Sequence, residues 1–360
     1  MSAALSRSGL SRSGRSRPDR VRAVAAPALA ALMVLGACGG GDKDEKKAAP
    51  STTAAPGTTA AAPLDPSRAP LTGLPLAAPI NRPALVVKID NAPKARPQFG
   101  IAAADLVIEE GVEGGITRFA TVFHSRDAGN VGPVRSARST DIHLATPLQR
   151  PLYAYSGAAP QIEAMLDRSP FVNVGIGRLP RAYRRERTRP SPYNLFSSTQ
   201  ALFAAAPAGA TNPKPLFDIG GADERPQGGP VTKITLAWVG VVRTDVTWNW
   251  DGKKFARVQN GTPHVDAGGG EIAPRNIVVL FVRYEDTGSR DNSGAAVPEA
   301  KLIGEGEAFV VRENTIVRGK WRKPSDEAPI QLLDAQGATV RLLPGQTWVE
   351  LPAPGMGSAS

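Results

Sequence analysis

The sequence predicts an α+β protein, with a mixed α/β N-terminal part at residues 71–220 and a β-rich part at residues 231–352. Two observations lead to this fold class. Stretches rich in β-branched residues, bounded by proline or glycine, dominate the chain and are typical of strands. Helical patterns are few, and all lie before the Gly- and Pro-rich section at residues 218–230. We place the domain boundary in that section.

The N-terminal part mixes both kinds of element. Strands are predicted at residues 84–90 (ALVVKID), 105–112 (DLVIEEGV) and 116–125 (ITRFATVFHS). The fewer helices are predicted at residues 140–146, at 160–168 with a proline in the first position, and at 198–206 behind a serine cap.

The C-terminal part alternates apolar with polar residues between turn signals, which is typical of strands. Predicted strand segments begin at residues 231 (VTKITLAWV), 244 (TDVTWNW), 276 (NIVVLFVRY), 308 (AFVVRENTIVRGKW) and 330 (IQLLDAQGATVRLLPGQTWVEL). Trp248 and Trp250 are two apart and share one strand face. We expect them to pack in a core or hairpin, with a ligand-stacking platform as the alternative. Residues 353–360 are predicted to be a disordered tail.

The N-terminus resembles a bacterial lipoprotein signal. The single cysteine, Cys38, ends the run LGAC, the pattern at which bacteria acylate the cysteine and cleave before it. Six arginines precede an apolar run at residues 23–34, which is too short to span a bilayer. We expect a signal peptide at residues 1–37 and a lipid anchor that holds the protein on the extracytoplasmic face of the cell membrane. The alternative is a chance cysteine in a short anchor helix.

Residues 38–70 are predicted to form a disordered linker, because they contain too few large apolar groups to offset the entropy of ordering. About 33 such residues reach roughly 30 Å as a flexible coil. Removing residues 1–37, with six arginines and one aspartate, lowers the formal charge from +10 to +5. This modest, dispersed excess argues against nucleic acid as a partner. It suits an anionic membrane or cell-wall surface.

The densest polar chemistry lies between Asn91 and Asn194. Three segments stand out: NAPKARPQFGIAAADLVIEEGVEGGITRF from residue 91, GPVRSARSTDIHLA from residue 132, and RPSPYNLF from residue 189. Together they resemble the YerB family of bacterial lipoproteins, which has no known biochemical role. The resemblance extends through GKKFARVQNGTPHVDAGGGEIAPRNIVVL and GATVRLLPGQTWVELP, which look like the second, β-rich domain of that family. This chain has Tyr193 where the family often has histidine, which weakens the hypothesis of a histidine base there.

Arginines follow a Gly-Pro turn in the second of these segments. Arg135 and Arg138 are three residues apart and precede a helix start at Ser139 and Thr140. Free amides at that helix start would point towards the same place as the guanidinium groups, an arrangement that suits phosphate or carboxylate. Arginine can hold either group in a bidentate manner. The predicted anion site comprises Arg118, Arg135, Arg138, Ser139 and Thr140, with Asn91, Asp105, Glu109, Asp141 and Asn194 as supporting polar residues.

Two other interpretations of these charges remain open. The arginines can neutralise acidic residues in a buried ion-pair network, the acids being Asp105, Glu109, Glu110 and Glu113. A cation site on the acidic run is a further alternative. Glu109 and Glu110 point to opposite faces of a strand, so only one of them could join a shared site.

The arginine-rich run at residues 178–189 has two interpretations. The simpler interpretation is that these side chains form a solvated face. The functional interpretation is that they form an electrostatic funnel that leads an anionic polymer towards Arg135.

Motifs for hydrolysis, metals and nucleotides are not found. The three histidines, His124, His143 and His264, are far apart, and none has the HExxH spacing of a zinc site. No G-x-S-x-G sequence surrounds Ser136 or Ser139, and the glycine runs fit neither nucleotide fingerprint. We therefore expect no metal and no cofactor.

The sequence favours a binding or accessory protein of the cell envelope that recognises an anionic cell-wall polymer or lipid phosphate. One alternative is an enzyme that acts on a phosphate-bearing envelope intermediate, with Asp105, Glu109 or Asp141 as base or metal ligand. Another is a protein-interaction module that uses the β-rich domain.

Overall fold

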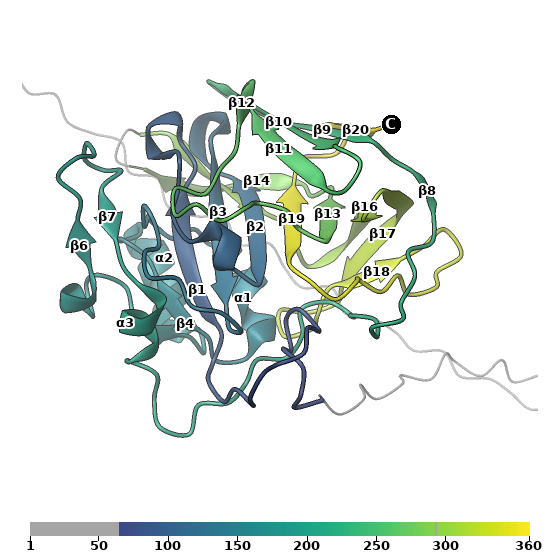
Figure 1. Ribbon diagram of the computed structural model, residues 1–360. Coiled ribbons are helices and arrows are strands. Elements are labelled where there is room, and N and C mark those ends of the chain that lie inside the picture. Colours follow the sequence, from purple (N-terminus) through teal and green to yellow (C-terminus); the bar gives the residue numbers. More distant parts are fainter. Residues whose placement is uncertain (1–64, 292–293) are drawn as a thin grey trace, which may run out of the picture. The chain divides into compact units, whose positions relative to one another are not determined.

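The computed structural model describes residues 65–291 and 294–360 (Figure 1). The predicted signal peptide, Cys38 and most of the predicted linker lie outside these residues. The end of the linker prediction is corrected: Arg68 forms a β-bridge with Pro75, and Ala69 is buried. No helix within the described ranges has the length and apolar character needed to cross a bilayer.

One large mixed sheet crosses most of the described chain (Figure 1). Its eleven strands come from both sides of the predicted domain boundary. In spatial order they are β18 (Gln331–Leu333), β17 (Thr315–Lys323), β16 (Gly304–Arg312), β13 (Asn276–Leu280), β19 (Thr347–Leu351), β2 (Leu106–Gly111), β3 (Thr117–Phe123), β1 (Leu85–Asp90), β4 (Leu152–Ala154) and β5 (Val172–Asn173), with β8 (Gly229–Pro230) paired to β17.

A second sheet is built from the C-terminal part, and two short hairpins complete the strands. The second sheet consists of β12 (Thr262–Pro263), β11 (Phe255–Gln259), β10 (Arg243–Trp250), β9 (Lys233–Val239) and β20 (Gly357–Ala359). The hairpins are β14 (Tyr284–Arg290) with β15 (Ala296–Ala300), and β6 (Arg184–Arg185) with β7 (Leu195–Phe196).

The C-terminus contradicts the predicted disordered tail at residues 353–360. Strand β20 pairs antiparallel with β9, and the Ser360 amide donates to the Lys233 carbonyl over 2.9 Å. The free edge of β9 offers backbone groups that a following strand satisfies. Composition alone did not reveal that edge.

Three α-helices lie in the N-terminal part: α1 (Thr140–Ala145), α2 (Pro160–Arg168) and α3 (Thr199–Phe203). The bounds of α2 match the predicted helix at residues 160–168. Helix α1 ends one residue earlier than the predicted helix at residues 140–146. Helix α3 begins behind the predicted cap, since the Ser198 hydroxyl accepts from the Ala201 amide. It ends three residues early. The protein is therefore strand-rich, with a few short helices.

Both faces of the main sheet are buried. Strand β2 illustrates this: Leu106 and Ile108 join a core that includes residues of α1 and α2, whereas Val107 faces a core shared with the second sheet. Trp248 lies in that second core, 5.2 Å from the Trp348 ring in an edge-to-face contact. The prediction that Trp248 is a core residue is confirmed.

Strand β19 joins the two halves of the sequence. It pairs in parallel with β2 on one side and with β13 on the other. The two predicted domains therefore share one sheet, and their boundary at residues 218–230 stays a prediction.

Candidate anion-binding cleft

Five arginines converge on one cleft of about 440 Å³, which we call the arginine cleft. They come from four places in the chain: β3, the segment before α1, the β6–β7 hairpin and the end of β14. The opposite wall is the loop at residues 156–160, which leads into α2. The arginines are Arg118, Arg135, Arg138, Arg185 and Arg290.

Arg118 and Arg138 are held by Glu113. The Arg138 Nε and Nη2 atoms each lie 2.6 Å from a Glu113 carboxylate oxygen, and Arg118 Nη2 lies 3.8 Å from Oε2. Arg118 Nη1 also donates to the Ser136 carbonyl over 3.0 Å. Burial, with the charge of Arg138 second, lowers the pKa of Arg118 to about 10, so Arg118 stays positive at neutral pH.

Arg135 is the most open of the three predicted arginines. Its side chain is 27% exposed, and its Nε lies 2.7 Å from Asp90 Oδ2. Neither of its Nη atoms donates to a described residue, and the side chain lines the cleft. The four N–H groups on these two atoms are therefore available to donate hydrogen bonds to a ligand.

The ion-pair alternative describes part of this arrangement. Of the four acids expected to neutralise the arginines, only Glu113 contacts them, and Asp90 supplies the other carboxylate. Three arginines against these two carboxylates leave one positive charge at the cleft floor, and Arg185 adds one at its rim. Arg290 also lines the rim, but its Nη1 atom lies 2.9 Å from Asp286 Oδ1, so this charge is paired. The aspartate Asp291 also lines the cleft and reduces that excess. The paired arginines are thus held in place and still face the open space.

The loop opposite the arginines is tied to them by backbone hydrogen bonds. The Ser156 amide donates to the Arg135 carbonyl, and the Ala137 amide to the Gly157 carbonyl, each over 3.0 Å. Gly157 has a φ of 140°, in the region that favours glycine. Within the described ranges, the backbone amides of Gly157 and Ala158 have no protein partner, so they are free to donate into the cleft.

Ser139 and Thr140 do not line the arginine cleft, which corrects their place in the predicted site. Helix α1 begins at Thr140 as expected, and its second and third amides are already used: Asp141 donates to the Arg138 carbonyl and Ile142 to the Ser139 carbonyl. The Thr140 hydroxyl accepts from the Ala300 amide over 3.0 Å. A six-residue helix in which these two amides are hydrogen bonded has few free donors left for a ligand.

The supporting polar residues are likewise distributed over separate places. Asp105 caps a turn by accepting from the backbone amides of His124 and Ser125, and burial raises its pKa. Asp141 accepts from Lys88 over 2.7 Å and from Tyr153 over 2.6 Å. Neither carboxylate lines the cleft.

Asn194 lies beside the arginine cleft, because its Oδ1 accepts from Arg185 Nη1 over 2.9 Å. The adjacent Pro192 lines the cleft directly. The PYN step therefore lies at the predicted site, although its tyrosine is not among the lining residues.

Asn91 and Glu109 belong to a buried network on the other face of the sheet. Asn91 Nδ2 lies 3.0 Å from Glu109 Oε1, and the second Glu109 oxygen pairs with Arg257. Arg257 Nη1 donates to His264 Nδ1 over 2.8 Å, and because arginine only donates, Nε2 of His264 carries the proton that goes to Gln98 Oε1. Burial, followed by the nearby Arg257 charge, holds the pKa of His264 well below its usual value, so this histidine is neutral.

Glu350 completes this network from β19. Its Oε1 accepts from Trp248 Nε1 over 2.8 Å. Burial raises the pKa of Glu350, and the neighbouring Glu109 carboxylate raises it further. Sequence reasoning missed Arg257, His264 and Glu350 as a cluster. Arg257 lies at an inward position of the alternating strand FARVQ, which was the one available signal.

Lys88, Glu110 and Asp141 form a separate buried cluster on the helical side of the sheet. Lys88 donates to both carboxylates, and all three side chains are fully buried. Burial raises the pKa of Glu110 to about 7, against the opposing charge of Lys88. Lys88 was detectable as a charge inside the apolar strand LVVKID.

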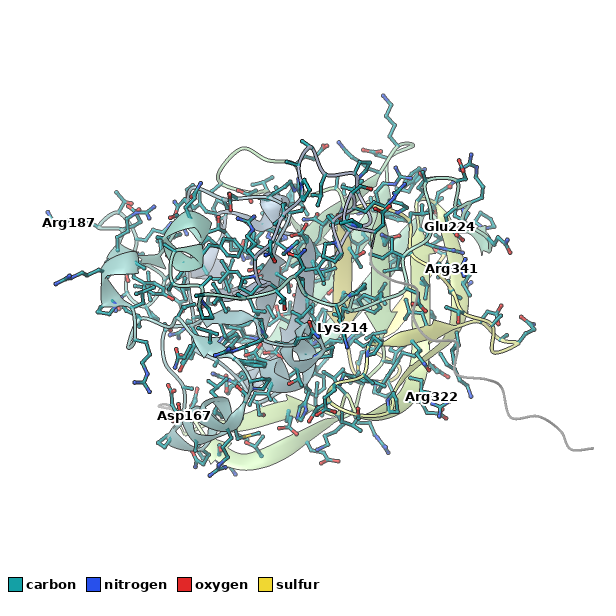
Figure 2. The ribbon with its side chains drawn as sticks, turned by 90° about the horizontal axis from the view of Figure 1, so that it is seen from below. Asp167, Arg187, Lys214, Glu224, Arg322 and Arg341 are labelled. Carbon is teal, nitrogen blue, oxygen red and sulfur yellow. The ribbon has the colours of Figure 1, made fainter. Side chains whose placement is uncertain are left out.

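The arginine-rich run at residues 178–189 divides into different roles. Arg189 donates to the Ala95 and Pro97 carbonyls and lies 5.4 Å from the Phe196 ring centroid, which is a structural position. Arg187 extends away from the molecule in Figure 2. Only Arg185 of this run lines the arginine cleft.

Two parts of the sequence match known protein families. Residues 71–211 match the N-terminal domain of DUF3048, a family described as proteins of unknown function, and residues 234–349 match its C-terminal domain. The chain belongs to the DUF3048 family. A DUF3048 relative named "Putative lipoprotein YerB", from Bacillus subtilis (strain 168), is 28% identical over 313 residues, which cover 81% of this chain and 88% of the relative.

The crystal structure of Bacillus subtilis YerB resembles this DUF3048 structure with a TM-score of 0.69. The match covers 81% of this chain and 99% of the other, at 24% identity. At that identity the likeness shows the fold. The predicted resemblance to the YerB family is confirmed, and the family description assigns no reaction or ligand.

Proposed function

We propose that this DUF3048 protein is a lipid-anchored protein of the cell envelope that binds an anionic envelope ligand in the arginine cleft. The observation that carries the proposal is the convergence of five arginines from distant parts of the chain on one open space. Guanidinium groups match the planar geometry of carboxylate and phosphate. Focused positive potential in a cleft also raises the local concentration of an anionic ligand.

Binding is favoured over catalysis by the position of the carboxylates. An enzyme acting on a phosphate-bearing intermediate needs a base or metal ligand that reaches the open space. Asp105, Glu109 and Asp141, the carboxylates predicted for that role, are fully buried and hydrogen bonded elsewhere. Among the described residues that line the cleft, Asp291 is the one carboxylate, so the cleft lacks a pair of converging carboxylates. The third candidate, a protein-interaction module, has one observation in its favour: Val241, at the β9–β10 turn, is 95% exposed. A single turn is much smaller than the patches that mark interaction sites.

Replacing Arg135 by lysine tests the anion site. Arg135→Lys keeps the positive charge but loses the planar guanidinium group that can hold phosphate through two hydrogen bonds. We therefore expect the affinity for inorganic phosphate to fall about ten- to a hundredfold, corresponding to roughly 1.5–3 kcal/mol. Isothermal titration calorimetry measures the affinity, and thermal denaturation measures stability. Arg322→Lys is the matched control, because Arg322 is an exposed arginine on β17 away from the cleft. A loss of stability with unchanged phosphate affinity would mean that Arg135 is structural only.

Attachment to the membrane rests on the LGAC pattern and on the name of the relative. We expect Cys38→Ser to leave an unprocessed or soluble protein. Mass spectrometry of the parent protein should find Cys38 at the N-terminus with at least two acyl chains, because one chain gives only marginal binding. An unmodified Cys38 behind an intact leader contradicts the lipoprotein proposal.

A further inference from the structure

A second cleft of about 320 Å³ adjoins the arginine cleft, and Ser156 and Gly157 line both. The two clefts therefore meet at the loop that precedes α2. The second cleft differs sharply in charge, because two carboxylates, Glu163 and Asp167, line it with only one arginine, Arg178. A ligand that spans the loop meets an arginine-rich surface at one end and a carboxylate-containing surface at the other.

The two carboxylates are positioned by helix α2. Glu163 and Asp167 are four residues apart, so they lie on the same helix face one turn from each other. Tyr155 donates its hydroxyl to Glu163 Oε2 over 2.7 Å and accepts from Asn173 Nδ2 over 2.8 Å. These bonds fix Glu163 while its Oε1 accepts from no described residue. The cleft thus presents carboxylate acceptors at defined positions.

The chemistry of the second cleft fits hydroxyl groups. A hydroxyl both donates and accepts, and this cleft offers acceptors on Glu163 and Asp167 beside donors on Arg178 and Ser156. A second phosphate would be repelled by the two carboxylates. A cationic group such as an ammonium would face Arg178, and it could use none of the donors.

We propose that the ligand is a sugar phosphate, either free or as part of a glycan, with its phosphate in the arginine cleft and its hydroxyl-bearing ring in the second cleft. This inference rests on the proposed function, since it assumes an anion among the five arginines. The junction at Gly157 is compatible with a continuous ligand, because a Cβ added there meets no atom within 4 Å. Glu163 and Asp167 fix the orientation of the ligand, because they would repel the phosphate if the ligand bound in reverse with its phosphate in the second cleft.

Calorimetry on the purified full-length protein in detergent tests the inference with four probes: inorganic phosphate, glucose 1-phosphate, glucose and phosphocholine. We expect glucose 1-phosphate to bind about tenfold more tightly than phosphate, the effect of one or two neutral hydrogen bonds. Glucose alone should bind far more weakly than either, because it lacks the anionic group. Tighter binding of phosphocholine than of glucose 1-phosphate overturns the sugar assignment in favour of an ammonium.

Asp167→Ala separates the two clefts. Asp167 is exposed and makes no hydrogen bond to the described chain, so its removal leaves the fold intact. We expect the variant to bind glucose 1-phosphate about three- to tenfold more weakly and inorganic phosphate no more weakly than the parent. Glu305→Ala, which removes an exposed carboxylate on β16, is the matched control. In Figure 2 Asp167, which belongs to helix α2, lies far across the view from Arg322, the control residue used for the arginine cleft.

The results distinguish the failure of this inference from the failure of the proposed function. Phosphate binding that depends on Arg135, without a gain for glucose 1-phosphate or an effect of Asp167→Ala, refutes the sugar site alone. No binding of phosphate or glucose 1-phosphate refutes both. Equal weakening of phosphate and glucose 1-phosphate by Asp167→Ala also contradicts the inference, because it shows that Asp167 acts on the fold or on the anion.

Discussion

At the scale of single residues, the structure separates charges that hold the fold from charges that face open space. Arg138 makes a two-bond contact with Glu113, and Arg135 keeps both Nη atoms without a described partner. The two residues are three apart in the sequence and of the same type. Their different surroundings come from the neighbouring carboxylates, which lie on β1 and in the turn after β2. The availability of the Arg135 Nη atoms is therefore determined by the contacts of this residue and not by its type.

His143 allows a prediction at this scale, because it links α1 to two acids of the C-terminal half. Its Nδ1 lies 2.6 Å from Asp326 Oδ1, and its Nε2 lies 3.8 Å from Glu299 Oε1. Interaction with Glu299 raises the pKa of His143 above its usual 6.5, and interaction with His143 lowers the pKa of Glu299 from 4.5 to about 2. The histidine contribution is full below pH 6.5 and is lost as the pH rises through its raised pKa. The glutamate contribution is full above pH 4.5 and is lost as the pH falls towards 2.

His143→Gln should therefore lower the free energy of unfolding most between about pH 4.5 and pH 6.5, where both contributions are present. The difference between parent and variant should shrink on both sides of this window. Urea denaturation at a series of pH values measures it. The range from about pH 4 to about pH 9 brackets the titration of both groups. If the difference in free energy of unfolding between parent and variant stays constant over this range, the linkage is contradicted.

At the scale of elements, strand β2 explains why the acidic run does not form one site. Its side chains alternate between the two faces of the sheet. Glu109 contacts Arg257 on the face towards the second sheet, and Glu110 contacts Lys88 on the face towards the helices. Each glutamate is thus neutralised in a different core. The sequence prediction that the two point to opposite faces is confirmed, whereas their partners come from segments far along the chain.

Helix α2 shows how one element can shape two clefts. Its N-terminal loop forms a wall of the arginine cleft, and its exposed face carries Glu163 and Asp167 into the second cleft. Proline at the first position and an apolar stripe at Ile162 and Leu166 place the helix against the sheet. The helix is thus held by its buried face, while its polar face lines the second cleft.

At the scale of the whole described chain, the parallel pairing of β19 with β2 connects the two predicted domains. We expect residues 71–220 and 231–352 to unfold together for this reason, because loss of either half exposes strand edges and a buried sheet face of the other. All five tryptophans lie in the C-terminal half, so their fluorescence reports on that half alone. Far-ultraviolet circular dichroism reports on both halves.

Leu85→Ala in β1 tests this coupling. Leu85 is fully buried, and its truncation should cost about 2–5 kcal/mol. We expect the thermal midpoint to fall equally by tryptophan fluorescence and by circular dichroism, although Leu85 lies in the N-terminal half. Val241→Ala, at a 95% exposed position, is the control and should leave both midpoints in place. An unchanged fluorescence midpoint in Leu85→Ala shows two domains that fold independently.

Much of the local structure could be predicted from the sequence, because it depends on short-range patterns. The helix Pro160–Arg168 and the strand Leu85–Asp90 follow from proline placement and β-branched runs within a few residues. The LGAC pattern that ends at Cys38 and the family resemblance are likewise properties of contiguous residues, as is the arginine spacing at Arg135 and Arg138. By itself the sequence determined these elements and the residue types of the proposed anion site.

Only the tertiary structure decided which of these residues meet. The sheet order places β19 beside β2, although about 240 residues separate them in the sequence, an interval on the order of a domain length. It also brings Arg185 and Arg290 to Arg135, and it leaves Ser139 and Thr140, at the start of α1, outside the lining of the cleft. Pairing partners are selected by complementary edges and buried surface over the whole fold, and a pattern read along one segment carries no information about them.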